Sequence, residues 1–323
     1  MIDIYTFEYN NGANEFIKLV KDGKVSNSEY YQFAIAQLEF IKKASPNPIP
    51  YINQQAEYYH LDGNLRRAGE QYHEVLRRDP FVPLSEKETE RIRKFCPILR
   101  VIPKECFPLK DFVAIHHPTE PLIGYHFFWE DDYDFPDDYE PCDHEEMWVK
   151  YDPETEIVTN VMSFFHSRVI ESDAAVLEAG ENHQRPVIRI EWGKHGSLLK
   201  GWEEMQEPLT GVPIMEWLKT TYEHVKAGGR VPKHPLKRFW PQGFEGTWEE
   251  YVDFSITVDP LKLLEKKPLM FKTRWVNAVM FTQCLLYNFH PKMEWPERFF
   301  DSIQDEKGTA KGNHESYQIV NKG

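Results

Sequence analysis

The chain has 323 residues, of which 38 are basic and 52 acidic, so its formal net charge is −14. This length suits one large domain or two ordinary ones, and the content of 41% apolar and 28% charged residues excludes a disordered chain. The acidic balance argues against nucleic acid and anionic membranes as main partners, while 14% aromatic residues favour a β-rich core.

We expect neither a secretory signal nor a membrane-spanning helix. The N-terminal stretch MIDIYTFEYNNGANEF holds acids and no long apolar run, and no apolar stretch elsewhere approaches the roughly 20 residues that a bilayer span needs. The cysteines show no CxxC spacing, which speaks against a zinc knuckle or a redox pair and favours reduced thiols. The sequence therefore predicts a cytoplasmic protein and carries no signal for an oligomeric state.

Residues 1–85 are predicted to be helical. Ser28 is a candidate N-cap for a helix that ends in two lysines, and the prolines of the stretch SPNPIPY then interrupt it. The next stretch, Tyr58–Pro80, has Gly63 at its turn and predicts a helical hairpin packed on the main domain. Its spacing resembles one tetratricopeptide unit, but a stable array needs about three copies.

From Pro83 on, short apolar runs separated by proline, glycine and acidic turns predict strands. The runs are Ile98–Ile102, Phe112–Ile115, Tyr125–Trp129, Glu146–Tyr151, Ile157–Phe165 and Val187–Trp192. Runs of this length and spacing are typical of a β-sandwich or a barrel. In the last run the apolar residues alternate with Arg189 and Glu191.

After Lys200 the pattern is mixed. Helical spacing from Ile214 to Val225 predicts a helix that ends at the glycine pair 228–229, and short helices are predicted at Thr247–Tyr251 and Pro260–Lys266. We therefore expect an α+β protein. Its parts are a helical N-terminal segment (1–85), a central β-sandwich core (86–205), a mixed helical and extended part packed on the core (206–300) and a flexible tail (301–323).

The densest charge in the chain lies between Glu130 and Glu146, where ten acidic residues occur without a lysine or an arginine. An aromatic run precedes this acidic loop, and a second apolar run begins at Met147. So many like charges on a short loop repel one another unless a cation or a cationic ligand offsets them. A solvated acidic surface loop is the alternative interpretation.

Five blocks between about residues 90 and 205 resemble, in the same order, sequences of the vacuolar-sorting-associated family and of the necrosis-inducing proteins. They are Arg93–Pro108, Tyr125–Asp132, Asp143–Val149, Ser163–Ser167 and Pro186–Ser197. The resemblance implies a β-sandwich core. In the necrosis-inducing proteins the acidic positions and an HxxDxE block hold a divalent cation in a surface cavity, which implies a cation site here.

Carried over position by position, the resemblance implies a cation held by Asp132, Glu140, Asp143 and Glu145. Glu140 stands where the family has a histidine, so the set is all oxygen and suits Mg²⁺, Ca²⁺ or Mn²⁺. On a strand, Asp143 and Glu145 share one face and His144 points the other way. An EF-hand is not expected, because no glycine occupies the sixth place of the loop.

His166 and His195 lie in the two later blocks and are candidate catalytic residues, because imidazole can act as acid or base near neutral pH. If both also bind the ion, a mixed site for Mn²⁺ or Fe²⁺ results. Ordinary core or surface roles are the alternative. The candidate substrate-binding residues, for each of which packing is the alternative, are Tyr125, His126, Trp129 and Arg168.

The sequence contains no pattern of a nucleophile-elbow hydrolase, a P-loop, a dinucleotide fold or a zincin. The acidic loop and the resemblance together predict a divalent-cation-dependent intracellular enzyme that acts on a small oxygen-rich substrate. One rival hypothesis is a non-catalytic protein that binds a glycan or a lipid head group through the cation, as the cytolytic relatives do. Another is a structural scaffold in which the ion only holds the acidic loop in place.

Overall fold

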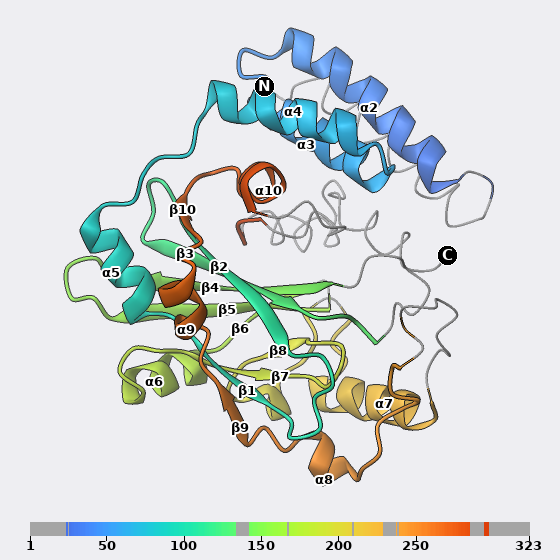
Figure 1. Ribbon diagram of the computed structural model, residues 1–323, viewed down its shortest axis with the longest axis vertical. Helices are drawn as coiled ribbons and strands as arrows, with labels where there is room; N and C mark the ends of the chain where they lie inside the picture. The colour runs from blue at the N-terminus through green and yellow to red at the C-terminus, as the bar shows by residue number, and fades with distance from the viewer. Residues whose placement is uncertain are drawn as a thin grey trace. The chain divides into compact units, whose positions relative to one another are not determined.

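The structure, a computed structural model, describes residues 24, 26–133, 142–166, 168–208, 210–228, 237, 239–284 and 294–296. The chain divides into two units, one with the described residues up to Val82 and from Thr273 on, the other Pro83–Lys272. Figure 1 labels the helices and strands of both.

Helices form the first unit. They are α2 (Asn27–Ala44), α3 (Ile49–Leu61), α4 (Leu65–Arg78) and α10 (Val276–Val279), which continues as the π-helical turn η3 (Met280–Cys284). Where the structure describes the N-terminal segment, the predicted helices are confirmed. Tyrosine rings pack α2 against α3, since the ring centroids of Tyr30 and Tyr31 each lie 5.9 Å from that of Tyr58.

The N-cap of α2 is Ser26 and not Ser28, so this detail of the sequence prediction was wrong. Ser26 Oγ accepts a hydrogen bond from the Glu29 N–H (3.2 Å), and the Glu29 carboxylate accepts one from the Ser26 N–H (2.8 Å). This reciprocal capping box needs a glutamate three residues after the cap, a spacing that Ser26 has and Ser28 lacks. Ser28 instead donates a hydrogen bond to Asp62 at 2.6 Å.

Two sheets form the second unit. The larger has the strand order β10-β2-β3-β4-β5-β6, and the smaller has the order β8-β7-β1-β9. The strands are β1 (Ile98–Val101), β2 (Leu109–His116), β3 (Leu122–Trp129), β4 (Asp143–Tyr151), β5 (Val158–Phe165), β6 (Arg168–Glu171), β7 (Val187–Ile190), β8 (Ser197–Leu198), β9 (Ile256–Val258) and β10 (Met270–Lys272). The pairs β10–β2 and β1–β7 are parallel, and the other pairs are antiparallel.

Helices flank these sheets. They are α5 (Glu86–Lys94), α6 (Asp173–Glu181), the 3-10 turn η1 (Trp202–Glu204), α7 (Ile214–Lys226), α8 (Trp248–Tyr251) and α9 (Leu261–Lys266). The predicted strand runs and the three helices predicted after Lys200 are confirmed. The sequence does not predict β6, β8, β9 and β10, which have two to four residues and lie outside the predicted apolar runs. Strands β1 and β7 also have four residues, but they lie in the predicted runs Ile98–Ile102 and Val187–Trp192. Gly228, with φ 99°, follows α7 as predicted, whereas Gly229 and the predicted tail lie outside the described residues.

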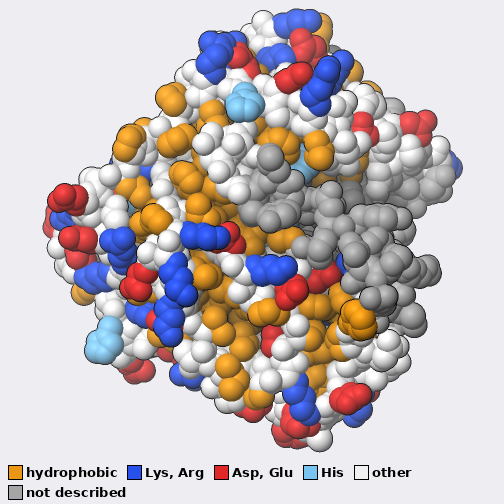
Figure 2. Space-filling model, in the orientation of Figure 1, with side chains coloured by type: hydrophobic (Ala, Val, Ile, Leu, Met, Phe, Trp, Pro, Cys, Tyr) orange, Lys and Arg blue, Asp and Glu red, His pale blue; other side chains and the backbone are white. Residues whose placement is uncertain are grey.

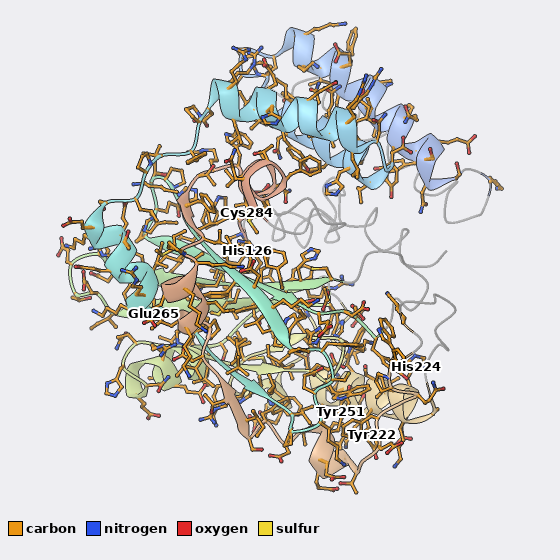
Figure 3. The ribbon with its side chains drawn as sticks, viewed as in Figure 1. His126, Tyr222, His224, Tyr251, Glu265 and Cys284 are labelled. Carbon is orange, nitrogen blue, oxygen red and sulfur yellow. The ribbon has the colours of Figure 1, made fainter. Side chains whose placement is uncertain are left out.

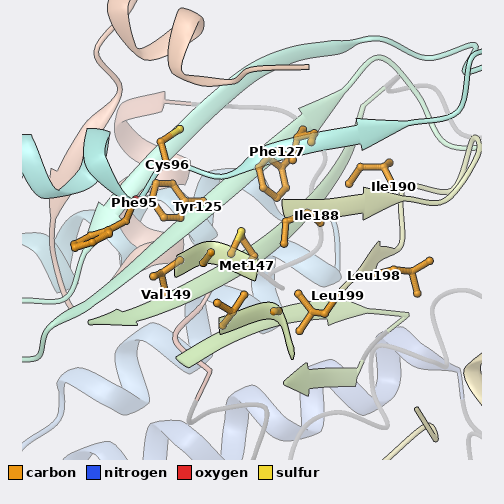
Figure 4. Packing of buried hydrophobic residues seen from close by; sticks show 14 of the residues in the cluster. Phe95, Cys96, Tyr125, Phe127, Met147, Val149, Ile188, Ile190, Leu198 and Leu199 are labelled. Atoms are coloured by element: carbon orange, nitrogen blue, oxygen red, sulfur yellow. The ribbon is translucent and has the colours of Figure 1, made fainter. Parts of the chain in front are cut away.

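Both sheets bury side chains in one common core. Phe127 and Met147 come from the larger sheet, and Ile188 and Leu198 from the smaller (Figure 4). Apolar side chains on the inner faces of two sheets are what hold a sandwich together. The predicted α+β class with a central β-sandwich is therefore confirmed, and of the two all-β possibilities the open sandwich is the one observed.

Strand alternation divides the side chains of β3 and β4 between two faces. Trp129 pairs with Asp143 on the core face, whereas His126 pairs with Glu146 on the opposite face. On the core face of β3 and β4, the carboxylates are those of Asp143 and Glu145, at the start of β4. This end of the two strands is therefore the polar end of the sandwich interior.

None of the helices in the described part of the chain is long and apolar enough to cross a membrane. On the face of the molecule shown in Figure 2, lysine and arginine side chains are interspersed with aspartate and glutamate. The acidic side chains that this view shows outside the grey residues are therefore not gathered into one area.

Ser26→Ala is expected to lower the free energy of unfolding of the first unit by about 1 kcal/mol, because α2 loses its side-chain cap. Ser28→Ala is the matched control. It removes one exposed hydrogen bond, with an expected cost of about 0.5 kcal/mol. Chemical denaturation followed by far-UV circular dichroism measures both, and an equal or larger loss in Ser28→Ala would contradict the capping assignment.

Candidate functional site

Four loops meet at one end of the sandwich. Strands β1 and β7 are parallel, and β3 and β5 both run antiparallel to β4, so the loops that follow β1, β3, β5 and β7 gather where β4 begins. Hydrogen bonds from the loop after β7 to the start of β4 and to the residue after β5 bring the ends of the two sheets together. We call this region the loop end, and its described residues are 102–108, 130–133, 142–143, 166 and 191–196.

The turn Glu191–Gly196, between β7 and β8, lies at the centre of the loop end. The Glu191 N–H donates to the Gly196 carbonyl (3.1 Å), and the His195 N–H donates to the Glu191 carbonyl (3.0 Å). Gly193 and His195 have φ values of 64° and 54°. A residue with a β-carbon holds such a conformation only where its surroundings fix it, and the contacts of the His195 ring supply that constraint.

His195 lies between two carboxylates. Its Nδ1 is 2.8 Å from Asp143 Oδ2, and its Nε2 is 3.5 Å from Glu105 Oε1. The ring is fully buried and stacks on Trp129, with centroids 4.4 Å apart and planes inclined by 1°. Burial alone would lower the pKa of His195, but the two carboxylates outweigh it and raise this pKa to about 10. His195 is therefore a buried imidazolium at neutral pH.

Glu105 is fixed by the backbone. Its Oε1 accepts hydrogen bonds from the N–H groups of Cys106 (2.8 Å) and Phe107 (3.0 Å), and its Oε2 accepts one from Gly193 (3.0 Å). Burial would raise the pKa of this carboxyl, but His195 and these donors together hold it below its usual value. The loop after β1 is thus joined to the turn after β7 by an ionised side chain.

A second histidine contacts the same turn. His166, the residue after β5, has φ 44°, and its Nε2 is 2.5 Å from Glu191 Oε2. The hydroxyl of Tyr251, on α8, donates to the other oxygen of this carboxylate at 3.1 Å. The Glu191 side chain is fully buried, whereas 20% of the His166 side chain is exposed. Burial would raise the pKa of Glu191, but the facing His166 ring holds it below the usual value.

The negative charge of Asp131, near the start of the acidic loop, is offset by a lysine. Asp131 is buried, and its Oδ1 lies 3.2 Å from Lys237 Nζ while its Oδ2 accepts a hydrogen bond from Trp240 Nε1 at 3.0 Å. The Asp132 N–H donates to Asp131 Oδ1 at 2.9 Å. This carboxylate, the second residue of the acidic run, is thus balanced within the protein rather than left to repel its neighbours.

Three of the four proposed cation ligands lie in the described residues, where they form no group that could hold a metal ion. Asp143 and Glu145 share the core face of β4 as expected, and Asp132 follows the end of β3. Glu140 lies outside the described residues. No group of three or more His, Cys, Asp or Glu side chains that could hold a metal ion occurs in the part of the chain that the structure describes. The described carboxylates alone therefore do not form a complete cation centre.

The proposed substrate-binding residues are spread over the second unit. Trp129 reaches the loop end, where it stacks on the His195 ring. Tyr125 is buried in the common core, and its hydroxyl donates to the Ile92 carbonyl at 2.8 Å, which is a packing role. His126 lies on the opposite face of the sheet, with Nδ1 3.2 Å from Glu146 Oε2.

The fourth residue, Arg168, starts β6 two positions after His166, and its Nε is 2.5 Å from Glu207 Oε1. This contact balances a buried carboxylate, as the side chain of Glu207 is only 4% exposed. Of the proposed substrate-binding residues, Trp129 is therefore the one whose ring contacts a proposed catalytic histidine.

The sequence does not predict the roles of Glu105 and Glu191 in the loop end, or of Tyr251 on α8, which contacts Glu191. The alternation of the run from Val187 to Trp192 predicts that Glu191 leaves the apolar face, but not which side chain it meets. Tyr251 contacts Glu191 across 60 residues of chain, a distance over which sequence spacing carries no signal.

Three comparisons with known proteins give little further. No protein-family model matches the chain, and no curated protein matches it. Among solved structures, the crystal structure of Necrosis and Ethylene inducing Protein 2, from the causal agent of cocoa's witches' broom disease, aligns with a TM-score of 0.27 and 13% identity. The alignment covers 37% of this chain and 70% of that one. A likeness of this strength carries no conclusion about the family or function of this chain, and the vacuolar-sorting resemblance gains no support.

The buried His195 imidazolium predicts a loss of stability at alkaline pH. Its pKa of about 10 in the folded protein lies above the usual value of about 6.5 in an unfolded chain. The stabilisation is therefore complete below about pH 6 and is lost as the pH rises towards 10. His195→Gln, a neutral side chain of similar size, lacks this dependence.

We expect the difference in unfolding free energy between the wild type and His195→Gln to shrink steadily from pH 7 to about pH 10. Urea denaturation of both proteins across this range measures it. Taking the difference removes the contribution of other groups that titrate near pH 10. A constant or growing difference would show that His195 is not charged in the folded protein.

Proposed function

We propose that the loop end is the active site of an enzyme in which His166 transfers protons to and from a small oxygen-rich substrate. One observation carries the proposal: His166 is partly exposed while its Nε2 lies 2.5 Å from the buried carboxylate of Glu191. A partly exposed histidine oriented by a buried carboxylate is suited to act as a general acid and base.

The proton balance of such a reaction closes on His166. The ring accepts a proton from a substrate hydroxyl or from water, and the deprotonated oxygen forms a bond to an electrophilic carbon of the substrate while the bond from that carbon to the leaving oxygen breaks. Glu191 offsets the positive charge that the ring then carries, and the ring returns the proton to the departing oxygen. His195, fully buried and bracketed by two carboxylates, supports the geometry of the turn rather than the chemistry.

A divalent cation remains part of the proposal. Mg²⁺, Ca²⁺ or Mn²⁺ would be held by Asp132, Glu140, Asp143 and Glu145, with Fe²⁺ if histidines joined them. Because the described carboxylates do not fit an ion by themselves, this depends on Glu140 and its neighbours, and no proton-transfer step is routed through the ion. We also propose a cytoplasmic location, which the four free cysteines support.

A second candidate function is the binding of a glycan or lipid head group without chemistry. Trp217, on the first turn of α7, is 36% exposed, and its ring lies 5.5 Å from that of His166 at an angle of 33°. An exposed aromatic face beside a polar side chain suits a ring-shaped ligand that carries hydroxyl groups. This observation favours a glycan over a lipid head group.

To test the enzyme, the purified protein is incubated with pools of small hydroxylated and carboxylated metabolites, and turnover is followed by mass spectrometry. His166→Asn is expected to lower any turnover by at least about 100-fold, the usual contribution of a general acid–base group. His183→Asn is the matched control, because His183 is exposed and also has a positive φ (57°), which asparagine tolerates. Equal turnover in the two variants would remove His166 from the mechanism.

Glycan retention that Trp217→Ala abolishes, without any turnover, would favour the binding protein.

The cation is tested by elemental analysis of the purified protein and of Asp143→Asn and Glu145→Gln. We expect about one equivalent of Mg, Ca, Mn or Fe in the wild type and less in both variants, since each loses a charged oxygen ligand. A wild type without stoichiometric metal, whose melting temperature does not respond to added cations, would make the cation proposal wrong.

A further inference from the structure

We infer that Glu191 and Tyr251 hold His166 in a single tautomer, with the proton on Nε2, so that Nδ1 is the nitrogen that meets the substrate. This inference rests on the proposed function, and it names the reacting atom and two residues that position it. Neither Glu191 nor Tyr251 needs to touch the substrate. Both act through the ring of His166.

The carboxylate of Glu191 determines which nitrogen carries the proton. An ionised carboxylate only accepts hydrogen bonds, so a nitrogen 2.5 Å from it must donate. The hydrogen bond that Tyr251 donates to the other oxygen of Glu191 favours the ionised form of this carboxylate. The Glu191 side chain is fully buried, so no water competes for this oxygen, and the neutral ring of His166 is left with Nδ1 as its basic atom.

Tyr251 completes the arrangement from the other side. Its hydroxyl donates to Glu191 Oε1 at 3.1 Å, which leaves Oε2 for His166. The phenol ring is itself fixed, because its centroid lies 5.4 Å from that of Tyr222 and 5.1 Å from that of Phe244 (Figure 3). Tyr251 is therefore a positioning residue for His166, with Glu191 between them.

Gly196 shows how closely the pair is packed. A β-carbon at this position would lie 2.8 Å from His166 Nε2 and 2.9 Å from Glu191 Oε2. The backbone of Gly196 is not in the left-handed region, so alanine there meets no backbone strain and acts through these two contacts and a third, 3.1 Å from Phe165 Cδ2. Because the carboxylate is buried and tied to Tyr251, it has little room to move, and a methyl group must push the ring and the carboxylate apart.

The tautomer also fixes the side from which a substrate approaches. Nε2 faces the turn Glu191–Gly196, so the ligand must meet the ring at its other nitrogen. Trp217 lies beside this ring, and its exposed face is the surface along which a substrate would reach His166. The inference thus places proton transfer at one atom rather than at either end of the imidazole.

The test is ¹⁵N NMR of histidine-labelled protein, in which the shifts of the two ring nitrogens report the tautomer. Signals of His166 are assigned by their loss in His166→Asn. At a pH where the ring is neutral, we expect the wild type to show a protonated Nε2 and an unprotonated Nδ1. Glu191→Leu, which removes the acceptor, and Gly196→Ala, which separates the pair, should both give a mixture of tautomers. Gly180→Ala is the matched control, because a β-carbon there comes no closer than 3.9 Å to Gln184 Nε2.

Tyr251→Phe tests the outer hydrogen bond. Losing one hydrogen bond is expected to speed exchange of the His166 Nε2 proton with water about 10-fold, while the preferred tautomer stays the same. A wild-type ring protonated on Nδ1, or a tautomer unchanged in both Glu191→Leu and Gly196→Ala, would overturn the inference. An exchange rate unchanged in Tyr251→Phe would remove Tyr251 from it.

These measurements need no substrate, so they separate the inference from the function it rests on. The expected tautomer in a protein without turnover would leave the inference intact and remove the proposed enzyme. Turnover that depends on His166, in a protein whose His166 ring is protonated on Nδ1, would support the proposed enzyme and overturn the inference.

Discussion

The six-residue turn Glu191–Gly196 is the constraint on which the loop end depends. It joins β7 to β8, and through its side chains and backbone it contacts the loops that follow β1, β3 and β5. Glu105 accepts a hydrogen bond from the Gly193 N–H, and the Gly193 carbonyl accepts one from the Tyr133 N–H at 2.8 Å. Glu191 meets His166, and His195 meets Asp143. Two sheets that share an apolar core are thus tied together at their polar end by one short segment.

Burial gives the two histidines of the loop end different roles. Removing a charge from water is costly unless a partner of opposite sign and hydrogen bonds offset it. His195 has no exposed surface and lies between two carboxylates, which suits a permanent cation that fixes the fold. His166 contacts one carboxylate and keeps 20% of its side chain exposed, which suits a group that can reach a substrate. The two histidines therefore differ in role because their environments differ, although the residue type is the same.

Strand alternation and apolar runs predict the parts of this structure that depend on local order. They predict the six strands that lie in apolar runs, the helix beginning at Ile214 and the shared face of Asp143 and Glu145. They do not predict which charges neutralise one another, because such pairs form between loops. His195 and Asp143 are 52 residues apart, and Tyr251 and Glu191 are 60 apart. The acidic loop is the instructive case: composition alone suggests a missing cation, whereas the structure supplies Lys237 for Asp131 and His195 for Asp143.

The central claim is that the loop end holds one buried structural histidine and one accessible reactive histidine. Carbethoxylation of the native protein by diethyl pyrocarbonate, read residue by residue with mass spectrometry, tests it directly. The account predicts rapid modification of His166 and of the exposed His183, and no modification of His195 until the protein unfolds. Modification of His195 as fast as that of His183, or protection of His166 as complete as that of His195, would contradict it.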